Sequence, residues 1–336
     1  MKQMMAASTD TDGSRHVQPT SLGENTVARR RRYARNPERA PAMLTDRHIA
    51  FLSYLLQLRF LIAHQAAALC DTSAKRMQQI IRDCYDKGLI DKTAIARSAV
   101  GGTAKHSAGA LQFGSAPDLL SLTKCGVGLL DRAAGAKSRQ SVKRQATTSF
   151  FLSHELLTRD VFVWLTTISR RYPNCELETW KDGPSAFITL PGLKMPALRP
   201  DWWSVLKFDG FVTVFIGESD TGSERGSNHW TKKLNCYEAI LQSGKLSEVC
   251  GYSKARLLVI TTSAKRRDSL ASFVQKNSSK SMRDRFWFAH RETLSNSDLS
   301  APLWRRPGCD ELQPLLDPER LALIYRNSQN GHDCDC

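Results

Sequence analysis

The sequence lacks several features that would place it in other classes of protein. No apolar run approaches the roughly 20 residues that span a bilayer, and the first residues are polar, without the apolar stretch of a secretion signal. None of the nine cysteines forms a CxxC pair, and neither a Walker loop nor a GxGxxG motif is present. These absences predict a cytoplasmic protein with reduced thiols, no membrane partner and no nucleotide cofactor.

Positive charge is the main excess of the chain. The formal net charge is +15, and fifteen lysines and arginines stand against seven aspartates between Leu44 and Thr148. Such an excess attracts phosphate backbones at long range. We therefore expect double-stranded DNA as the first partner, bound mainly by this part of the chain.

Composition divides the 336 residues into folded and unfolded parts. The polar start of the chain has too few apolar side chains to order itself. Its basic run, Arg29, Arg30, Arg31 and Arg32, is either a solubilising tail or an arm for phosphates. The predicted parts are a disordered tail at 1–42, a DNA-binding domain at 43–132, a linker at 133–149, a second domain at 150–326 and a disordered tail at 327–336.

Hydrophobic periodicity predicts three helices and a hairpin in the first domain. Thr45 opens an apolar face that runs to Leu58, a short helix follows over 63–69, and Thr72 or Ser73 caps a third helix. Residues 91–114 have the composition of a hairpin, with a return strand over 119–122 and a further helix capped by Thr123. This order is typical of a winged helix-turn-helix.

Polar and basic side chains on the third helix and the hairpin are the predicted DNA contacts. Met77, Ile80 and Ile81 recur at helical spacing and should face inward, so the residues between them face solvent. The candidate DNA-binding residues are Ser73, Lys75, Arg76, Gln78, Gln79 and Arg82 on the helix, Lys92, Arg97 and Lys105 on the wing, and the four arginines of the arm.

The second domain is predicted to be a mixed sheet with helices on its faces. Strand-like runs lie at 176–180, 186–190, 201–207, 211–217, 256–261 and 286–290, and helical patterns lie at 150–171, 228–242, 265–276 and 318–326. A turn at Phe208, Asp209 and Gly210 predicts an antiparallel hairpin between the runs on either side of it. The predicted fold class is α+β, a winged helix followed by an α/β domain.

Acidic residues mark both strands of this hairpin. Asp201 precedes one strand, and alternation along the other places Glu218 and Asp220 on one face. Three carboxylates make a hard oxygen site for Mg²⁺, which can activate a water and stabilise charge on a scissile phosphate. Lys233 and Tyr237, one helical turn apart, could look onto the same place. The alternative from the same residues is an ordinary ion-pair network without a metal.

Several short segments follow one another in a characteristic order over residues 44–290. They are Leu44-Thr45-Asp46, residues 59–66, Lys87-Gly88-Leu89-Ile90, residues 122–126, His154-Glu155-Leu156, Arg199-Pro200-Asp201, residues 218–222, and Lys233-Leu234 with Tyr237. Their order and spacing resemble the replication-relaxation family, accessory proteins of the mobilisation protein C type linked to plasmid replication and the relaxosome.

The resemblance implies a winged-helix reader joined to a domain similar to the restriction-endonuclease-like fold. Members of that nuclease superfamily usually carry Glu-x-Lys at the end of the second hairpin strand, and Asp220 stands here in place of the lysine. Activation of water would then come from Lys232 or Lys233, or not occur at all. The resemblance also points to partners such as a relaxase, and it leaves a homodimer open.

Three hypotheses of function follow. The first is a DNA-binding accessory protein of plasmid replication or mobilisation with a vestigial or specialised nuclease core. The second is an active Mg²⁺-dependent endonuclease that uses Asp201, Glu218 and Asp220 as metal ligands and Lys233 as a helper cation. The third is a transcriptional repressor or a pure interaction module.

Overall fold

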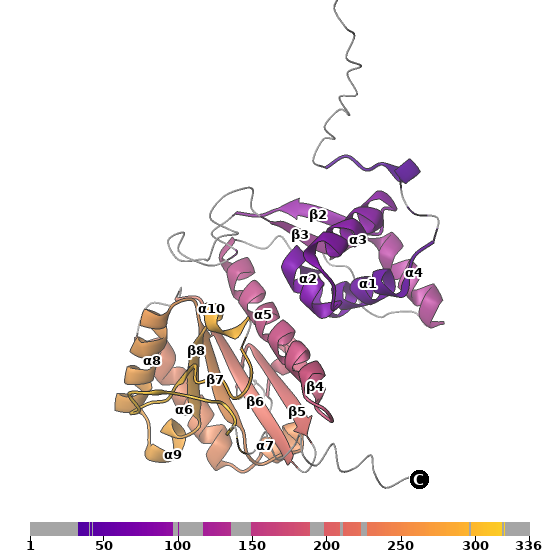
Figure 1. Cartoon of the computed structure of the whole chain (residues 1–336). Coiled ribbons are helices and arrows are strands. Elements are labelled where there is room, and N and C mark those ends of the chain that lie inside the picture. Colours follow the sequence, from indigo (N-terminus) through magenta and orange to yellow (C-terminus); the bar gives the residue numbers. More distant parts are fainter. Residues whose placement is uncertain are drawn as a thin grey trace, which may run out of the picture. The chain divides into compact units, whose positions relative to one another are not determined.

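The structure is a computed structural model whose elements fall into two groups. It describes residues 33–39, 41, 43–96, 100, 117–135, 149–188, 198–208, 211–222, 227–295, 297–317 and 319. We call residues 43–135 the first module and residues 149–317 the second module (Figure 1). Over the described stretches, no helix combines the length and the apolarity needed to cross a membrane.

The first module combines helices with a small antiparallel sheet. Its described helices are α1 (Asp46–Leu58), α2 (Ala63–Leu69), α3 (Ala74–Asp86) and α4 (Lys124–Ala134). Its strands β1 (Phe60–Leu61), β2 (Ile90–Ala94) and β3 (Asp118–Leu122) pair antiparallel in the order β1-β3-β2.

Side-chain caps begin two of these helices as the sequence predicted. The hydroxyl of Ser73 accepts the backbone N–H of Arg76 at 3.2 Å, and that of Thr123 accepts the backbone N–H of Gly126 at 3.1 Å. Each cap satisfies one of the backbone donors that the first helical turn leaves unpaired.

Residues 35–39, which the sequence placed before the first domain, contact the first module. Arg35 donates to the carbonyl oxygens of Tyr85 at 2.7 Å and Ile90 at 3.1 Å, and it pairs with Asp91 at 2.8 Å. A short 3-10 helix, η1 (Pro37–Arg39), follows. One guanidinium thus satisfies carbonyls at the end of α3 and on β2, which explains why residues counted as tail belong to the folded unit.

The core of the first module extends into the second. Leu52 and Leu55 of α1 and Met77 and Ile80 of α3 are buried in it. Phe162, which lies on the first helix of the second module, belongs to the same cluster of buried side chains. The two modules therefore share apolar packing in addition to polar contacts.

The second module is built on a seven-stranded sheet. Its described helical segments are α5 (Ser149–Arg171), η3 (Gly183–Ala186), α6 (Ser227–Gln242), α7 (Leu246–Cys250), α8 (Ala264–Asn277), α9 (Lys280–Arg283) and α10 (Arg291–Leu294). Its strands are β4 (Glu176–Asp182), β5 (Trp202–Phe208), β6 (Phe211–Asp220), β7 (Arg256–Thr261), β8 (Phe286–His290), β9 (Trp304–Arg305) and β10 (Leu312–Gln313).

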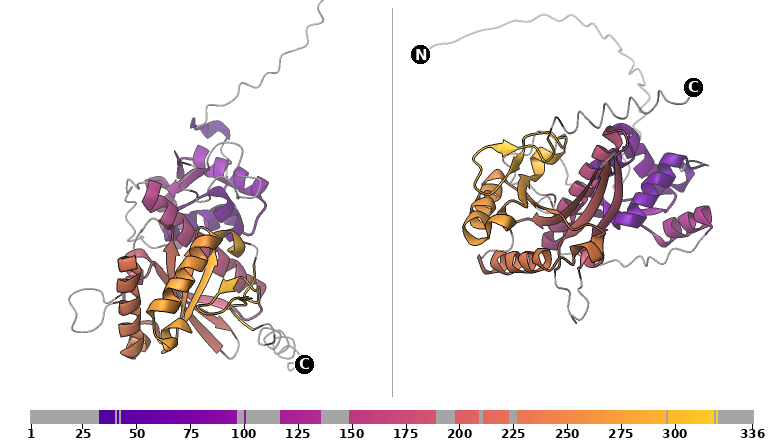
Figure 2. Two further views of the ribbon diagram at one scale, coloured as in Figure 1. Left: turned by 90° about the vertical axis from the view of Figure 1, so that its left-hand side faces the viewer. Right: turned by 90° about the horizontal axis from the view of Figure 1, so that it is seen from below.

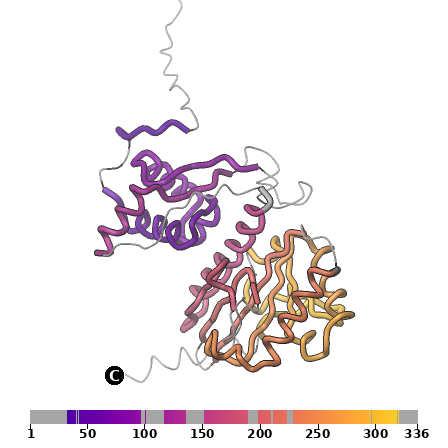
Figure 3. Tube along the Cα trace, turned by 180° about the vertical axis from the view of Figure 1, so that it is seen from behind, coloured from indigo at the N-terminus to yellow at the C-terminus, as the bar shows by residue number. Residues whose placement is uncertain are grey.

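The sheet is mixed, which confirms the predicted α+β class. Its strand order is β10-β9-β8-β7-β6-β5-β4, with β4, β5 and β6 antiparallel and β6, β7 and β8 parallel. Leu157, Val161 and Leu165 of α5 pack in one apolar cluster against the sheet, and the buried side chains of α6 and α8 pack in another, so helices cover the two faces (Figure 2). Figure 3 shows the long helix α5 lying alongside the strands of this sheet.

Some predicted elements differ in the structure. The expected strand at 186–190 is replaced, as far as it is described, by η3 and a single bridge between Ile188 and Leu198. Pro184 opens that short helix, which extends to Ala186, so the chain is helical where the strand was expected to begin. The two-residue strands β9 and β10 were not predicted. The helix expected at 318–326, the turn at 209–210 and most of the linker lie outside the described residues.

Candidate functional site

The β5–β6 hairpin brings Asp201 and Glu218 to the same end of the sheet. The backbone N–H of Asp201 donates to the carbonyl of Gly217 at 3.1 Å, and its carboxylate accepts the backbone N–H of Ser219 at 2.7 Å. Position 217 requires glycine, because a Cβ there would lie 1.9 Å from Cε2 of Trp202. The buried indole of Trp202 therefore packs directly against strand backbone next to both acids.

His154 of α5 pairs with Asp201. Its Nε2 lies 2.9 Å from Oδ2 of the carboxylate. Burial by itself would lower the pKa of His154, but the hydrogen bond to Asp201 and the negative charges nearby outweigh burial and raise it. Burial would likewise raise the pKa of Asp201, but the hydrogen bond and charge of His154 lower it, with help from Lys233. Both shifts favour an imidazolium paired with a carboxylate.

Glu218 is buried and held by two side chains of α6. Its Oε2 lies 2.6 Å from Nζ of Lys233, and its Oε1 accepts the hydroxyl of Tyr237 at 2.6 Å. Burial raises the pKa of Glu218 to about 7 and the charge of Asp201 adds to that rise, whereas Lys233 opposes it. Burial and the adjacent Glu218 raise the pKa of Tyr237 well above its ordinary value.

These five residues form a single site, which we call the carboxylate cluster. Its members are His154, Asp201, Glu218, Lys233 and Tyr237. The predicted placement of Lys233 and Tyr237 on one face of a helix agrees with this geometry, since both reach the same carboxylate. The contact between Glu218 and Lys233 is an ion pair, which is the alternative to a metal site that the sequence left open.

Asp220 does not join the cluster. Arg266 of α8 donates to both of its oxygens at 2.9 Å, and the indole N–H of Trp230 donates to one of them at 3.1 Å. The backbone N–H of Gly222 donates to the other at 2.9 Å. The carboxylate that replaces the expected lysine is therefore part of a separate bidentate ion pair with α8.

The donor set does not fit a magnesium ion. No three His, Cys, Asp or Glu side chains among the described residues are placed to hold a metal. Both oxygens of Glu218 accept hydrogen bonds, and Oδ2 of Asp201 faces two donors. Mg²⁺ demands near-octahedral oxygen coordination, so the structure does not bring Asp201, Glu218 and Asp220 together as the ligand set that the sequence suggested.

The candidate DNA contacts of α3 divide into exposed and internal side chains. Lys75, Arg76, Gln78 and Arg82 are exposed along one side of the helix. Gln79 is half-buried, and its amide donates to Asp83 at 2.7 Å. Asp83 also lies 3.3 Å from Nε2 of the buried His48, so Gln79 belongs to an internal network.

The other candidate contacts have different surroundings. Ser73 is exposed, and its hydroxyl caps α3. Nζ of Lys92 lies over the ring of Tyr85, 4.7 Å from its centroid. Arg97, Lys105 and the four arginines at 29–32 lie outside the described residues.

Sequence reasoning missed two residues of the site region. The sequence assigned no partner to His154, and it did not point to Arg266. Both contacts join residues far apart in the chain, so no local spacing could have revealed them. The one available signal was that His154 begins a segment used in the family resemblance.

The fold and the cluster define the class as a two-module α+β protein with buried, paired ionisable groups at one end of a mixed sheet. The chain belongs to the replication-relaxation family, whose model matches residues 52–252. The match runs from α1 past α7 and includes all five residues of the carboxylate cluster, and it confirms the family that the order of motifs indicated.

No curated protein matches the sequence. Among solved structures, the restriction endonuclease FokI is similar at 9% sequence identity and a TM-score of 0.26, over 74% of this chain and 42% of that one. The chain therefore spans less than half of the length of that structure.

Proposed function

We propose that this protein binds duplex DNA through α3 of a winged helix and serves as an accessory protein of plasmid replication or mobilisation. The observation that carries the proposal is the division of α3 into two faces. Met77, Ile80 and Ile81 are buried, whereas Lys75 and Arg76 stand in solvent. A helix with a basic polar face behind a short helix is suited to a major groove.

The surrounding elements support this use of α3. The order α1, α2, α3, then the antiparallel pair of β2 and β3, is the order of a helix-turn-helix followed by a wing. The formal charge of +15 supplies the long-range attraction to phosphates. In the second module, the order α5, β4, β5, β6, α6, β7 supports the nuclease-like scaffold that the family resemblance implies.

Fluorescence anisotropy with a short labelled duplex tests the proposal. Alanine at Lys75, Arg76 and Arg82 together should weaken binding at least about tenfold at physiological salt and reduce the salt dependence of the affinity. The matched control replaces Lys254, Lys276 and Lys280, which are exposed on the second module, and removes the same charge. Equal losses in both triple variants would show that the binding is not centred on α3.

Metal-dependent nicking stays as a second candidate because of one contact. Lys233 meets Glu218 at 2.6 Å, so a lysine reaches the acidic strand although Asp220 stands at the usual position. The unsuitable donor set weighs against this function. If the pure protein nicks supercoiled plasmid with Mg²⁺ or Mn²⁺, and Asp201→Ala abolishes the nicking, the second candidate replaces the first.

A further inference from the structure

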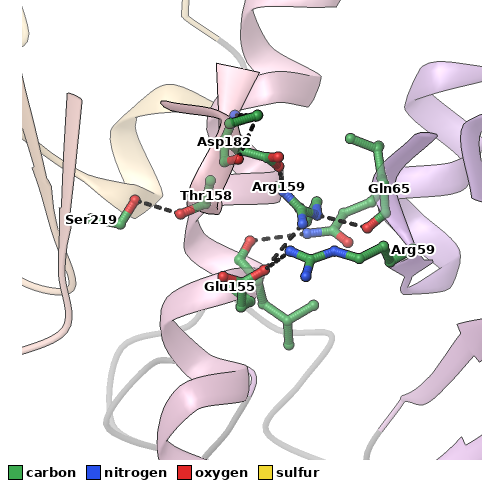
Figure 4. Close-up of polar contacts among 10 residues, drawn as sticks. Arg59, Gln65, Glu155, Thr158, Arg159, Asp182 and Ser219 are labelled. Carbon is green, nitrogen blue, oxygen red and sulfur yellow. Dashed lines mark hydrogen bonds and ion pairs between the residues drawn. The ribbon is translucent and has the colours of Figure 1, made fainter. Parts of the chain in front are cut away.

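Two turns of α5 connect the first module to the carboxylate cluster. In an α-helix, residues four apart lie on one stripe. Residues 154–160 form three such stripes, His154 with Thr158, Glu155 with Arg159, and Leu156 with Asp160. Each stripe makes its own polar contacts, and Figure 4 shows those of Glu155, Thr158 and Arg159 with residues of both modules.

The middle stripe reaches the end of α1. Arg59, the residue after α1, donates to Glu155 at 2.8 Å, and Arg159 donates to the same carboxylate at 3.1 Å (Figure 4). Arg159 is fully buried; it also donates to the carbonyl of Leu58 at 3.1 Å and pairs with Asp182 of β4. Positive and negative charges thus alternate from the first module into the sheet.

The third stripe binds α2. Gln65, which is fully buried, donates to the carbonyl of Leu156 at 3.2 Å and to Oδ1 of Asp160 at 2.7 Å. Arg291 of α10 pairs with the other oxygen of Asp160. A buried amide with both partners in α5 fixes the distance between the two helices, because losing either bond would leave a buried polar group unpaired.

The first stripe holds the acidic site. His154 lies 2.9 Å from Asp201. The hydroxyl of Thr158 lies 2.8 Å from that of Ser219 (Figure 4). The backbone N–H of Ser219 in turn donates to Asp201 at 2.7 Å. Helix α5 therefore contacts Asp201 directly and also through Ser219.

Arg59 itself has an unusual backbone. Its φ of 70° and ψ of −42° lie outside the regions that residues with a Cβ usually adopt. Such conformations persist only where the surroundings hold them. A Cβ on Gly183 would lie 3.9 Å from Nη2 of Arg59, and the N–H of Gly183 donates to the carbonyl of Asp201 at 3.1 Å. The guanidinium thus lies close to the backbone that carries Asp201.

We propose that Arg59 is a positioning residue for the carboxylate cluster. From the first module it holds α5 through Glu155, and α5 in turn holds the His154–Asp201 pair. Met77 and Ile80 of α3 lie in the same buried cluster as Phe162 of α5, so we expect a duplex bound at α3 to alter the surroundings of Asp201 through this helix. The link to DNA rests on the proposed function, whereas the positioning by Arg59 does not.

The test follows the hydrogen bond of His154 by NMR in the full chain labelled with ¹⁵N-histidine. The imidazole N–H that points to Asp201 should give a downfield proton resonance, which is assigned by its loss in His154→Gln. Arg59→Ala should move this resonance upfield, and Arg59→Lys should restore it in part. Arg132→Ala, at an exposed arginine of α4, is the matched control and should leave it in place. An unchanged resonance in Arg59→Ala overturns the proposal.

A glycine variant separates the side chain of Arg59 from its backbone. Glycine accepts a positive φ without strain, so Arg59→Gly removes the guanidinium and keeps the conformation. The same upfield shift in Arg59→Gly and Arg59→Ala supports positioning through Glu155. A shift in Arg59→Ala alone would trace the effect to the backbone and contradict the proposal.

Unfolding provides a second measurement. All seven tryptophans lie between Trp164 and Trp304, so their fluorescence follows the second module, whereas far-UV circular dichroism follows helices of both modules. The two urea transitions should coincide in the wild type and separate in Arg59→Ala. Coincident transitions in the variant would show that α5 is held without Arg59, against the proposal.

Addition of duplex DNA tests the link between the modules. In the wild type the His154 resonance should move on saturation with a short duplex, and in Arg59→Ala the duplex should still bind without moving it. Binding without a shift in the wild type would refute the link. Absence of binding, measured by anisotropy on the same samples, would refute the proposed function instead, and the DNA-free experiments would still decide the role of Arg59.

Discussion

Nζ of Lys233 lies 2.6 Å from Oε2 of Glu218, so the cation beside this buried acid comes from helix α6 and not from strand β6. The strand position where the family resemblance leads one to expect a lysine holds Asp220, which is paired with Arg266. Each of the two acids at the end of β6 therefore has its own cation from a different helix.

Lys233→Met should destabilise the protein. The change leaves Glu218 buried with Tyr237 as its hydrogen-bond donor, and an unpaired buried acceptor costs roughly 1–3 kcal/mol, more if it is charged. The free energy of unfolding is measured with urea and tryptophan fluorescence. Lys232→Met is the control, because Lys232 is its exposed neighbour on α6. Similar losses in both variants would count against the pairing.

Stability should depend on pH through Glu218. Burial raises the pKa of Glu218 from 4.5 to about 7. Between these values the folded protein holds a proton that the unfolded chain has released, so the stability that Glu218 contributes falls as pH rises through the folded pKa. The raised pKa of His154 acts in the same direction, and the lowered pKa of Asp201 acts in the opposite one, since its contribution is lost as pH falls.

Glu218→Gln isolates this effect, because glutamine does not titrate. The free energy of unfolding, measured from about pH 5 to about pH 8, should fall less steeply with rising pH in the variant than in the wild type. Parallel curves for the two proteins would mean that the pKa of Glu218 is not raised in the folded state.

Gly217→Ala should be strongly destabilising. The new Cβ would lie 1.9 Å from the buried ring of Trp202, which cannot move without disturbing the core. Overpacking of this kind costs about 1–3 kcal/mol or more. In α4, a Cβ on Gly128 would meet only the end of Arg132 at 3.7 Å, so Gly128→Ala should stabilise by about 0.5–1 kcal/mol. Thermal unfolding of both variants checks the contrast in sign.

Arg76→Ala and Gln79→Ala should have different effects although the residues are neighbours on α3. Arg76 is exposed, so its loss should weaken binding to duplex DNA and leave the melting temperature within about one degree. Gln79 bonds to Asp83, so its loss should lower stability and change DNA affinity little. Anisotropy measures the DNA affinity of both variants, and thermal unfolding measures their stability. A loss of DNA affinity without a loss of stability in Gln79→Ala would exclude Gln79 from the internal network.

Asp220→Lys should not restore a nuclease motif. It removes the bidentate partner of Arg266 and places a second cation in its place, at a cost of about 2–3 kcal/mol, less than for a fully buried pair. The exposed pair of Asp284 with Arg306 provides the control, because Asp284→Lys should cost under about 0.5 kcal/mol. Unfolding by urea gives both values, and a gain of plasmid nicking in Asp220→Lys would contradict the expectation.

Local patterns were sufficient to predict most of the elements. The helix at 63–69 and the strand at 256–261 have the predicted bounds, because their apolar spacing and their flanking turns are encoded within a few residues. The strands β9 and β10 have two residues each, which is too short for any periodicity. The short helix η3 overlaps the start of the strand expected at 186–190, and it depends on packing that spacing does not reveal.

The site could be predicted only in part. Alternation along β6 placed Glu218 and Asp220 on one face, and helical spacing placed Lys233 with Tyr237, so those local relationships were available from the chain itself. The partners of these side chains could not be predicted from the sequence. Glu218 is reached from α6 and Asp220 from α8, and this choice separates two acids that the sequence had grouped as metal ligands.

The sequence by itself determined the family, the α+β class, the basic face of α3 and the acidic hairpin, since each depends on residue type and short-range spacing. The tertiary structure alone decided which cation meets which carboxylate, that His154 pairs with Asp201, and that Arg59 reaches α5 from the other module. The reason is physical: a buried charge is paired by whatever donor the packing of distant helices brings within hydrogen-bond distance.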